Sequence, residues 1–294
     1  MTFAGTRQAA VRAYHDLLDH RNPQAAAALS YYSILGVFPA LIFLSAALAY
    51  IPIPGLFSDV LIAMGRVTPP GAMPIVYSVL KDILTKNQTA WLSFGMAGTI
   101  WLVSAAFDQL IDSLDTAYDI PNHRPFWKTR LLAVALAAIT GVLLTCAIVA
   151  MIIGPVAGGW IAGKLYVSRL FLSLWPFLHW IIAVSFSVFA VELIYFIAPN
   201  AKQSFLTNLP GAMFSVAGWI GLSYLLGIYF RHFQGYNRTY GTLGGLMALM
   251  TWLYWAYFIL LAGGEFNSEL AKANSASRSV RSKPSTPQRL DTAA

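Results

Sequence analysis

Six long stretches of the chain carry no charged side chain, and this pattern predicts its secondary structure. No Asp, Glu, Lys or Arg occurs in 22–58, 87–107, 131–163, 170–191, 203–230 or 239–264. A helix of about 20 mainly apolar residues crosses the hydrocarbon layer of a bilayer, and each stretch is long enough. The runs are continuous rather than alternating, which favours helices over barrel strands. We therefore expect six transmembrane helices, at about 29–51, 91–110, 131–154, 175–198, 209–230 and 241–263.

The composition agrees with an all-α polytopic membrane protein. Hydrophobic residues make up 57% of the chain and charged residues 11%, whereas soluble domains have about 25% charged residues. The net charge of +7 requires no nucleic-acid partner, because basic segments beside a bilayer meet anionic headgroups. The one cysteine, Cys146, excludes an internal disulfide and a Cys-based metal site, and we expect its thiol to be buried.

Six spans place both termini on one side of the membrane. With the termini in the cytosol, the cytosolic segments hold twelve Lys and Arg residues and the outer loops hold seven. Lys and Arg are enriched in cytosolic loops, so this distribution predicts cytosolic N- and C-termini.

The sequence divides the chain into three parts: a cytosolic amphipathic segment at 1–28, a transmembrane domain at 29–270, and a disordered basic cytosolic tail at 271–294. Apolar and charged positions predict a short helix at about 3–20 that lies along the membrane interface. The tail is rich in Ser, Lys and Arg and has few apolar residues with which to order itself.

Proline and glycine add local features to this plan. They divide the outer loop 52–90 into two helical stretches, at about 56–66 and 73–86. Pro39 lies inside the first span and predicts a helix kink, because proline removes one helical hydrogen bond. Small-residue spacing predicts close helix packing at three glycine pairs: Gly154/Gly158, Gly159/Gly163 and Gly241/Gly245.

Ionisable groups at membrane depth are costly and therefore mark functional candidates. Glu192 lies roughly 10 Å below the cytosolic end of the fourth span, at 1.5 Å per residue. Its carboxyl is protonated, paired with a neighbour or facing a wet cavity, or else it is an interfacial group that extends to water. The sequence leaves these alternatives open.

Four aspartates follow one another at spacings of four, three and four residues: Asp108, Asp112, Asp115 and Asp119. On a helix they occupy one stripe, so the second span is expected to continue beyond the bilayer with an acidic face. This is either a solvated face paired to Arg124, Lys128 and Arg130, or the acidic wall of a cytosolic vestibule. A stripe along one helix spreads its oxygens too widely to enclose a metal ion, and no metal site is predicted.

The connection between the fifth and sixth spans places aromatic residues beside arginines, among them Arg231, Tyr236 and Tyr240. This composition is typical of the aromatic belt at a membrane interface. It also suits a lipid-headgroup site, because arginine binds phosphate in bidentate fashion. The five histidines are scattered in sequence, with no pair at metal-ligand spacing.

Several segments resemble the YihY/virulence factor BrkB family. They are Ala25–Ser33 followed by Phe38-Pro39, Asn122–Leu131, Ala198-Pro199-Asn200, and a closing block of Tyr240–Gly244, Trp252-Leu253-Tyr254 and Gly263–Leu270. The resemblance implies a multi-pass bacterial inner-membrane protein of six helices. Glu265 matches the family's Gly-x-Glu-Leu-Asn-like pattern, although Phe266 stands where the pattern usually has an aliphatic residue. Phe196 and Asp115 also depart from the pattern, which more often has a basic residue and an asparagine there.

Members of this family have been labelled ribonucleases and linked to serum resistance and envelope lipids. The resemblance therefore implies a transporter or flippase for an amphiphilic envelope molecule. The sequence itself has no Walker A motif, and we predict no catalytic residues and no cofactor. We expect a cavity lined by Glu192, Asp108, Asp112, Arg231, Tyr236, Tyr240 and Glu265.

Two other functions remain as alternatives to transport. The first is a membrane scaffold for envelope proteins, and the second is a membrane-tethered ribonuclease. Transport requires a cavity between the helices, whereas a scaffold requires only tight packing. The expected partners are membrane lipids and an amphiphilic envelope substrate rather than nucleic acid, and the glycine pairs permit a homo-oligomer without indicating one.

Overall fold

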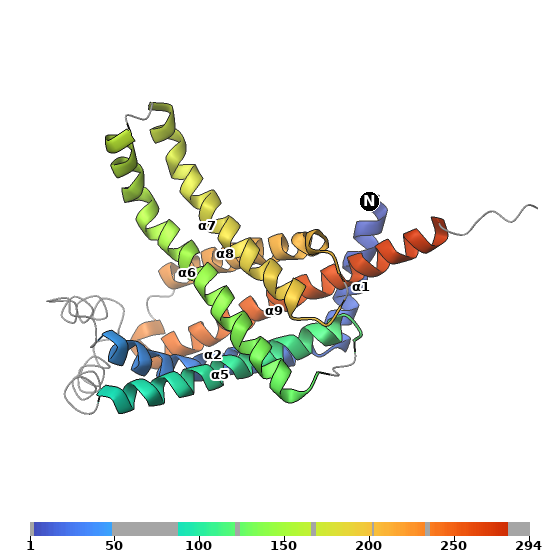
Figure 1. Ribbon diagram of the computed structural model, residues 1–294, viewed down its shortest axis with the longest axis horizontal. Helices are drawn as coiled ribbons and strands as arrows, with labels where there is room; N and C mark the ends of the chain where they lie inside the picture. The colour runs from blue at the N-terminus through green and yellow to red at the C-terminus, as the bar shows by residue number, and fades with distance from the viewer. Residues whose placement is uncertain are drawn as a thin grey trace, which may run out of the picture.

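The computed structural model describes residues 3–48, 88–120, 124–165, 169–201, 203–232 and 236–281 (Figure 1). These residues form helices and contain no strand. The helices are α1 (Phe3–Asp19), α2 (Asn22–Leu48), α5 (Gln88–Ala117), α6 (Phe126–Leu165), α7 (Arg169–Ile197), α8 (Leu209–His232) and α9 (Tyr236–Arg281), with a short 3-10 helix, η1 (Phe205–Thr207). The helices predicted for the outer loop, at 56–66 and 73–86, lie outside the described residues.

Six of these helices are long and apolar enough to cross a membrane. Their candidate spans are Asn22–Phe43, Thr89–Ala117, Phe126–Met151, Phe177–Ile197, Leu209–Ile228 and Gly245–Ala273. The predictions of an all-α fold and of six membrane-spanning helices are therefore confirmed. The placement of the termini in the cytosol stays a prediction.

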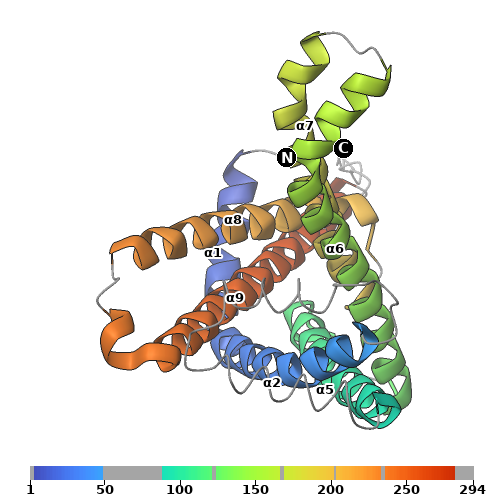
Figure 2. The ribbon, with the colours of Figure 1, turned by 90° about the vertical axis from the view of Figure 1, so that its left-hand side faces the viewer.

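The helices are arranged in pairs that converge at one end of the molecule. Helices α2 and α5 lie side by side, α6 and α7 form a long hairpin, and α8 packs on α9 (Figures 1 and 2). The far part of the α6–α7 hairpin extends away from the other helices (Figure 1). The ends of α5 and α7 and the starts of α2, α6 and α8 meet beside α1 and α9. We call this the terminal end of the bundle.

The buried core lies at this terminal end because each helix turns apolar side chains inward there. Its large members include Leu29 of α2, Leu114 of α5, Leu136 of α6, Tyr195 of α7 and Leu261 of α9. One core therefore ties all the membrane-crossing helices together close to the chain ends. A functional group placed in this core is held by several helices at once.

The outward faces of the helices are apolar, as a bilayer requires. Val142 and Ile148 of α6 and Phe177 and Ile181 of α7 are exposed, and such a surface is suited to contact with lipid tails. Cys146 is also exposed on α6. The prediction of a buried thiol is therefore wrong, because this part of α6 turns its face outward rather than into the bundle.

Helices α8 and α9 approach closely through glycines. A Cβ added at Gly263 would lie against the side-chain oxygens of Ser215 and Tyr195 and 2.8 Å from the backbone oxygen of Gly211. Contacts that short cannot form without a shift of the backbone. Only hydrogen fits at Gly263, and this close approach brings α9 against both α7 and α8.

We expect Gly263→Ala to destabilise the fold by about 1–3 kcal/mol, because the added methyl group overpacks a closely fitted helix contact. The matched control is Gly221→Ala, where a Cβ would meet nothing within 4 Å. Removing a helical glycine there should leave stability unchanged or raise it by up to about 1 kcal/mol. Thermal unfolding in detergent, followed by helical circular dichroism, tests the pair. Equal stability of the two variants would contradict the close contact.

The terminal end includes α1 and the last part of α9. Helix α1 packs against α9 and buries Ala13 and Leu17. Helix α9 continues to Arg281, so the predicted tail boundary at 271 falls inside a helix. Lys272 follows that boundary, and its ammonium lies 2.6 Å from Asp119 and 2.9 Å from Glu269. These ion pairs attach α9 to the bundle beyond its last apolar turn, and residues 282–294 lie outside the described part.

Candidate functional site

Three carboxyl side chains from three different helices are buried at the terminal end. They are Asp115 of α5, Glu192 of α7 and Glu265 of α9, with 1%, 1% and 0% of their surface exposed. Carboxylates are rarely buried to this extent unless they are paired. We refer to these three residues as the carboxyl cluster.

Glu192 belongs to the inward face of α7. Its neighbours Val191 and Tyr195 are also buried, which fixes the direction in which this side of the helix points. Among the described residues, neither carboxyl oxygen of Glu192 has a hydrogen-bond partner. The alternative of an interfacial glutamate that extends to water is therefore wrong, because α7 carries the group into the core of the bundle.

Glu265 receives its partners from the turn between α1 and α2. The Asn22 amide donates to Glu265 Oε1 at 2.7 Å, and His20 Nδ1 lies 2.8 Å from the same oxygen. Arg21 between them has a positive φ of 56°, and this sharp turn directs both flanking side chains towards α9. The second oxygen, Oε2, is buried and has no partner in the described part of the chain.

Asp115 is covered by the segment that follows α7. Its Oδ1 accepts a hydrogen bond from the backbone N–H of Asn200 at 2.8 Å. Its Oδ2 is buried and unpaired among the described residues. Arg124 holds the same segment by donating to the carbonyl of Ala198 at 2.8 Å.

The predicted acidic stripe does not form one continuous face. Asp108 is partly exposed and lies 3.6 Å from Arg130, as expected of a solvated face. Asp112 is exposed, whereas Asp115 is buried. Helix α5 ends at Ala117, and Asp119 has a φ of 54° and turns to Lys272. The stripe prediction assumed that the helix continues to Asp119, and it is wrong there because the chain leaves the helix two residues earlier.

Tyr118 connects the carboxyl cluster to the start of α8. Its hydroxyl donates to Asn208 Oδ1 at 3.2 Å. Burial raises the pKa of the Tyr118 phenol, and the nearby carboxylates of Glu192 and Glu265 raise this pKa further. A phenol kept neutral in this way is a hydrogen-bond donor close to two buried acids.

Asn267 of α9 holds the first turn of α8. Its Oδ1 accepts from the backbone N–H of Gly211 at 2.9 Å, and its amide donates to the carbonyl of Asn208 at 2.8 Å. The first turn of a helix has N–H groups without helical partners, so the side chain acts as a cap supplied by another helix. Ser268 adds a bond from α9 to the carbonyl of Ala117 at 2.6 Å.

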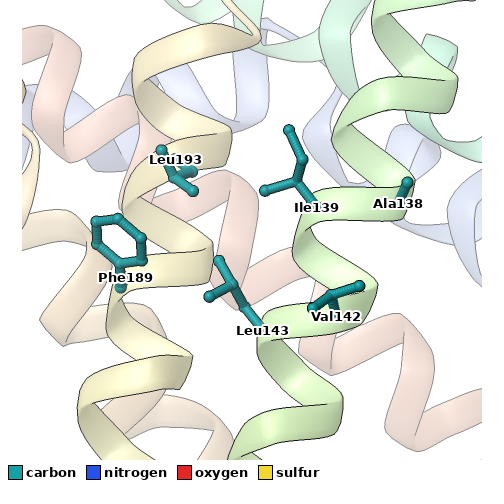
Figure 3. Close-up of a pocket in the computed structure, with 6 residues that line it drawn as sticks. All are labelled: Ala138, Ile139, Val142, Leu143, Phe189 and Leu193. Carbon is teal, nitrogen blue, oxygen red and sulfur yellow. The ribbon is translucent and has the colours of Figure 1, made fainter.

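An open groove of about 360 Å³ lies between α6 and α7 (Figure 3). Its lining is entirely apolar: Ala138, Ile139, Val142, Leu143, Phe189 and Leu193. Phe189 and Leu193 flank Glu192 along α7, so one stretch of this helix borders the groove and also supplies a buried carboxyl to the core. None of the residues predicted to line a cavity lines this groove.

The residues predicted to share a cavity lie in separate places. Glu192 and Glu265 are in the carboxyl cluster, whereas Asp108 and Asp112 lie earlier on α5 at partly or fully exposed positions. Arg231 is in the last turn of α8, and Tyr236 and Tyr240 are in the first turns of α9. The 24 residues of α8 separate its two ends by about 36 Å. The side chains of these last three residues lie outside what the structure describes.

Sequence patterns did not single out His20, Asn22, Tyr118 or Asn267. Their partners come from distant parts of the chain, and no local spacing indicates them. Within the described ranges, no group of three His, Cys, Asp or Glu side chains could hold a metal ion.

Comparison with known proteins gives consistent matches over most of the chain. A model of the family described as virulence factor BrkB matches residues 13–288. A ribonuclease-like protein of Bacillus subtilis, YfkH, is 32% identical over 86% of this chain and 91% of its own length. A membrane protein of Pseudomonas paraeruginosa named UPF0761 is 26% identical over 78% of this chain. The chain spans about half, 54%, of that relative's length. No solved structure matches the chain.

Proposed function

The chain belongs to the virulence factor BrkB family, and from this premise we propose that it moves an amphiphilic envelope molecule with an acyl chain across a membrane. The proposal includes the bacterial inner membrane as its location, with both termini in the cytosol. The excess of Lys and Arg in the segments that would then face the cytosol supports this orientation.

The observation that carries the proposal is the position of α7 between two environments. Phe189 and Leu193 border an apolar groove on the outer side, and Glu192 on the same stretch places a carboxyl in the buried core of the bundle. An amphiphile requires an apolar path for its chain and a polar region for its headgroup. The volume of about 360 Å³ is within the range of small-molecule sites.

The occupant of the groove is a lipid acyl chain. All of the lining residues lie within the candidate spans Phe126–Met151 and Phe177–Ile197, so the groove opens where lipid tails surround the protein. It offers no polar lining group to hold a water-soluble ligand in a fixed orientation.

The ribonuclease-like name of the Bacillus relative suggests hydrolysis of RNA as an alternative. This alternative has less support, because two-metal nucleases need clustered metal ligands, and the described residues contain no such cluster. We propose that the protein acts without catalysis.

Filling the groove tests transport directly. We expect Ala138→Phe to slow translocation of a fluorescent phospholipid in proteoliposomes, because the added ring occupies the groove. An acyl chain that loses about 1–3 kcal/mol of apolar contact there should cross about fivefold to a hundredfold more slowly. The matched control is Ile148→Phe, which adds an aromatic ring at an exposed position of α6 outside the groove. The control should translocate lipid at the unmodified rate. If the unmodified protein translocated lipid no faster than empty vesicles, this result would contradict transport and favour the scaffold.

A further inference from the structure

Glu192 differs from the other buried acids because no polar group of the described protein pairs with it. It is 1% exposed, neither of its oxygens has a hydrogen-bond partner, and no ion pair among the described residues includes it. A buried ionised carboxylate without a partner carries an uncompensated desolvation penalty, and a neutral carboxylic acid in the same place carries a much smaller one. We propose that Glu192 is a proton-binding site within the transmembrane bundle.

The surroundings of Glu192 favour the uptake of a positive charge. The titratable groups at this end include acids and phenols: Asp115 of α5, Tyr118 just after α5, Tyr195 of α7, and Glu265 and Glu269 of α9. Among the basic groups at this end, His20 contacts Glu265, Lys272 contacts Asp119 and Glu269, Arg124 contacts the carbonyl of Ala198, and Arg130 contacts Asp108. A proton is therefore the cation that compensates Glu192.

A metal cation fits this place less well than a proton. Even Ca²⁺ and Mg²⁺, which bind oxygen, take about six or more ligands. The described residues offer no group of three His, Cys, Asp or Glu side chains placed to hold one ion. A single carboxyl with two unpaired oxygens can still bind a proton, which needs only one acceptor atom.

Polar groups also lie in the loop between α7 and α8. The Tyr118 hydroxyl donates to Asn208, whose own amide nitrogen is buried and unpaired among the described residues, as is Gln203 Oε1. Unpaired buried donors and acceptors of this kind are positions where water forms bridging hydrogen bonds. We expect protons to reach Glu192 from the terminal end by way of such groups.

The proton site deepens the function proposed above by naming a coupling ion, and only that coupling role rests on transport. Binding itself is tested without any lipid assay. Dicyclohexylcarbodiimide reacts with protonated carboxyls in apolar surroundings. The acid proton moves to one carbodiimide nitrogen, the carboxyl oxygen bonds to the central carbon, and the adduct rearranges to a stable N-acylurea. Mass spectrometry of the membrane-embedded protein locates this adduct.

We expect the adduct on Glu192, as a fraction of the Glu192 peptide in each sample, to be about tenfold more abundant at about pH 5 than at about pH 8, because burial favours the protonated carboxyl. Sodium ions should not change this ratio, and Glu192→Gln should remove the adduct. Protection by sodium would overturn the proposal and indicate a sodium site. An adduct ratio that does not change with pH would also overturn it.

Infrared spectroscopy provides a second readout that does not depend on reagent access. The carbonyl band of a protonated carboxyl should be present in the unmodified protein at about pH 5 and lost in Glu192→Gln. A spectrum unchanged by Glu192→Gln at every pH would overturn the proposal even if labelling failed. If both readouts succeed while lipid translocation is absent, the proton site stands and the transport function fails. If lipid is translocated but neither readout detects a proton on Glu192, the transport function stands and the proton site fails.

Discussion

Asn267→Leu should destabilise the folded protein by about 2–4 kcal/mol, because it removes the cap that α9 supplies to α8. Asn267 is 1% exposed, and its side chain bonds the N–H of Gly211 and the carbonyl of Asn208. Leucine has a similar size and can form neither bond. The Gly211 N–H is then left buried, whereas the Asn208 carbonyl keeps its bond from the N–H of Ala212 at 3.1 Å.

Two further substitutions separate capping from packing in an unfolding experiment in detergent. Asn267→Asp keeps the acceptor for the Gly211 N–H and loses the donor to the Asn208 carbonyl. Its stability should therefore lie between that of the unmodified protein and that of Asn267→Leu. The matched control is Gln109→Leu, which removes an amide from a half-buried position where it donates to Ser113 at 3.5 Å. A loss at Gln109 as large as that at Asn267 would contradict the capping role.

The six spans could be predicted from the sequence because the signal for a membrane helix lies within the residues of that helix. A run without charge is sufficient, and no knowledge of neighbouring helices is needed. The end of α9 shows where this reasoning stops. By a count of charges, Glu265, Glu269 and Lys272 mark the edge of the membrane, yet all three lie inside α9. Their partners His20, Asn22 and Asp119 come from distant parts of the chain, which a charge count does not consider.

The candidate site was only partly predictable for a related reason. Glu192 is conspicuous as a lone acid in an apolar run, so the sequence identified it. Its environment was not predictable, because the surrounding groups come from α5 and α9, far away in the chain. Helical spacing places Asp115 on a stripe that is either a solvated face or the wall of a cytosolic vestibule. The segment at Asn200 that covers Asp115 cannot be inferred from this spacing.

Glycine packing shows the same limit. The spacing rule pointed to pairs four residues apart in one helix, and a Cβ at Gly154 does lie close to His179. At Gly245, by contrast, a Cβ would meet nothing within 4 Å. The close approach of α8 and α9 instead joins Gly211 and Gly263, one from each helix. A rule that compares positions within one helix cannot find glycines that face one another across two.

His20→Ala should cost about 2–4 kcal/mol of folding stability, because it removes a partner from the fully buried carboxyl of Glu265. His20 Nδ1 lies 2.8 Å from Glu265 Oε1, and Asn22 would remain as the partner of that oxygen. The His20 side chain is 21% exposed, so we expect less than the about 3–5 kcal/mol seen for fully buried pairs. Loss of this contact also loosens α1, since His20 ends the segment that packs on α9.

A double-mutant cycle assigns this loss to the contact itself. Glu265→Gln replaces the buried carboxyl by an amide, so adding His20→Ala to it should cost less than His20→Ala alone, with a coupling free energy of about 0.5–3 kcal/mol. The matched control is Asp108→Asn, which removes an ion pair 3.6 Å long between Arg130 and a carboxyl that is 35% exposed. An ion pair so open to solvent contributes about 1 kcal/mol or less. If His20→Ala and Asp108→Asn were equally mild and the cycle showed no coupling, Glu265 would not depend on His20. The docking of α1 would then rest on apolar contacts such as those of Ala13 and Leu17.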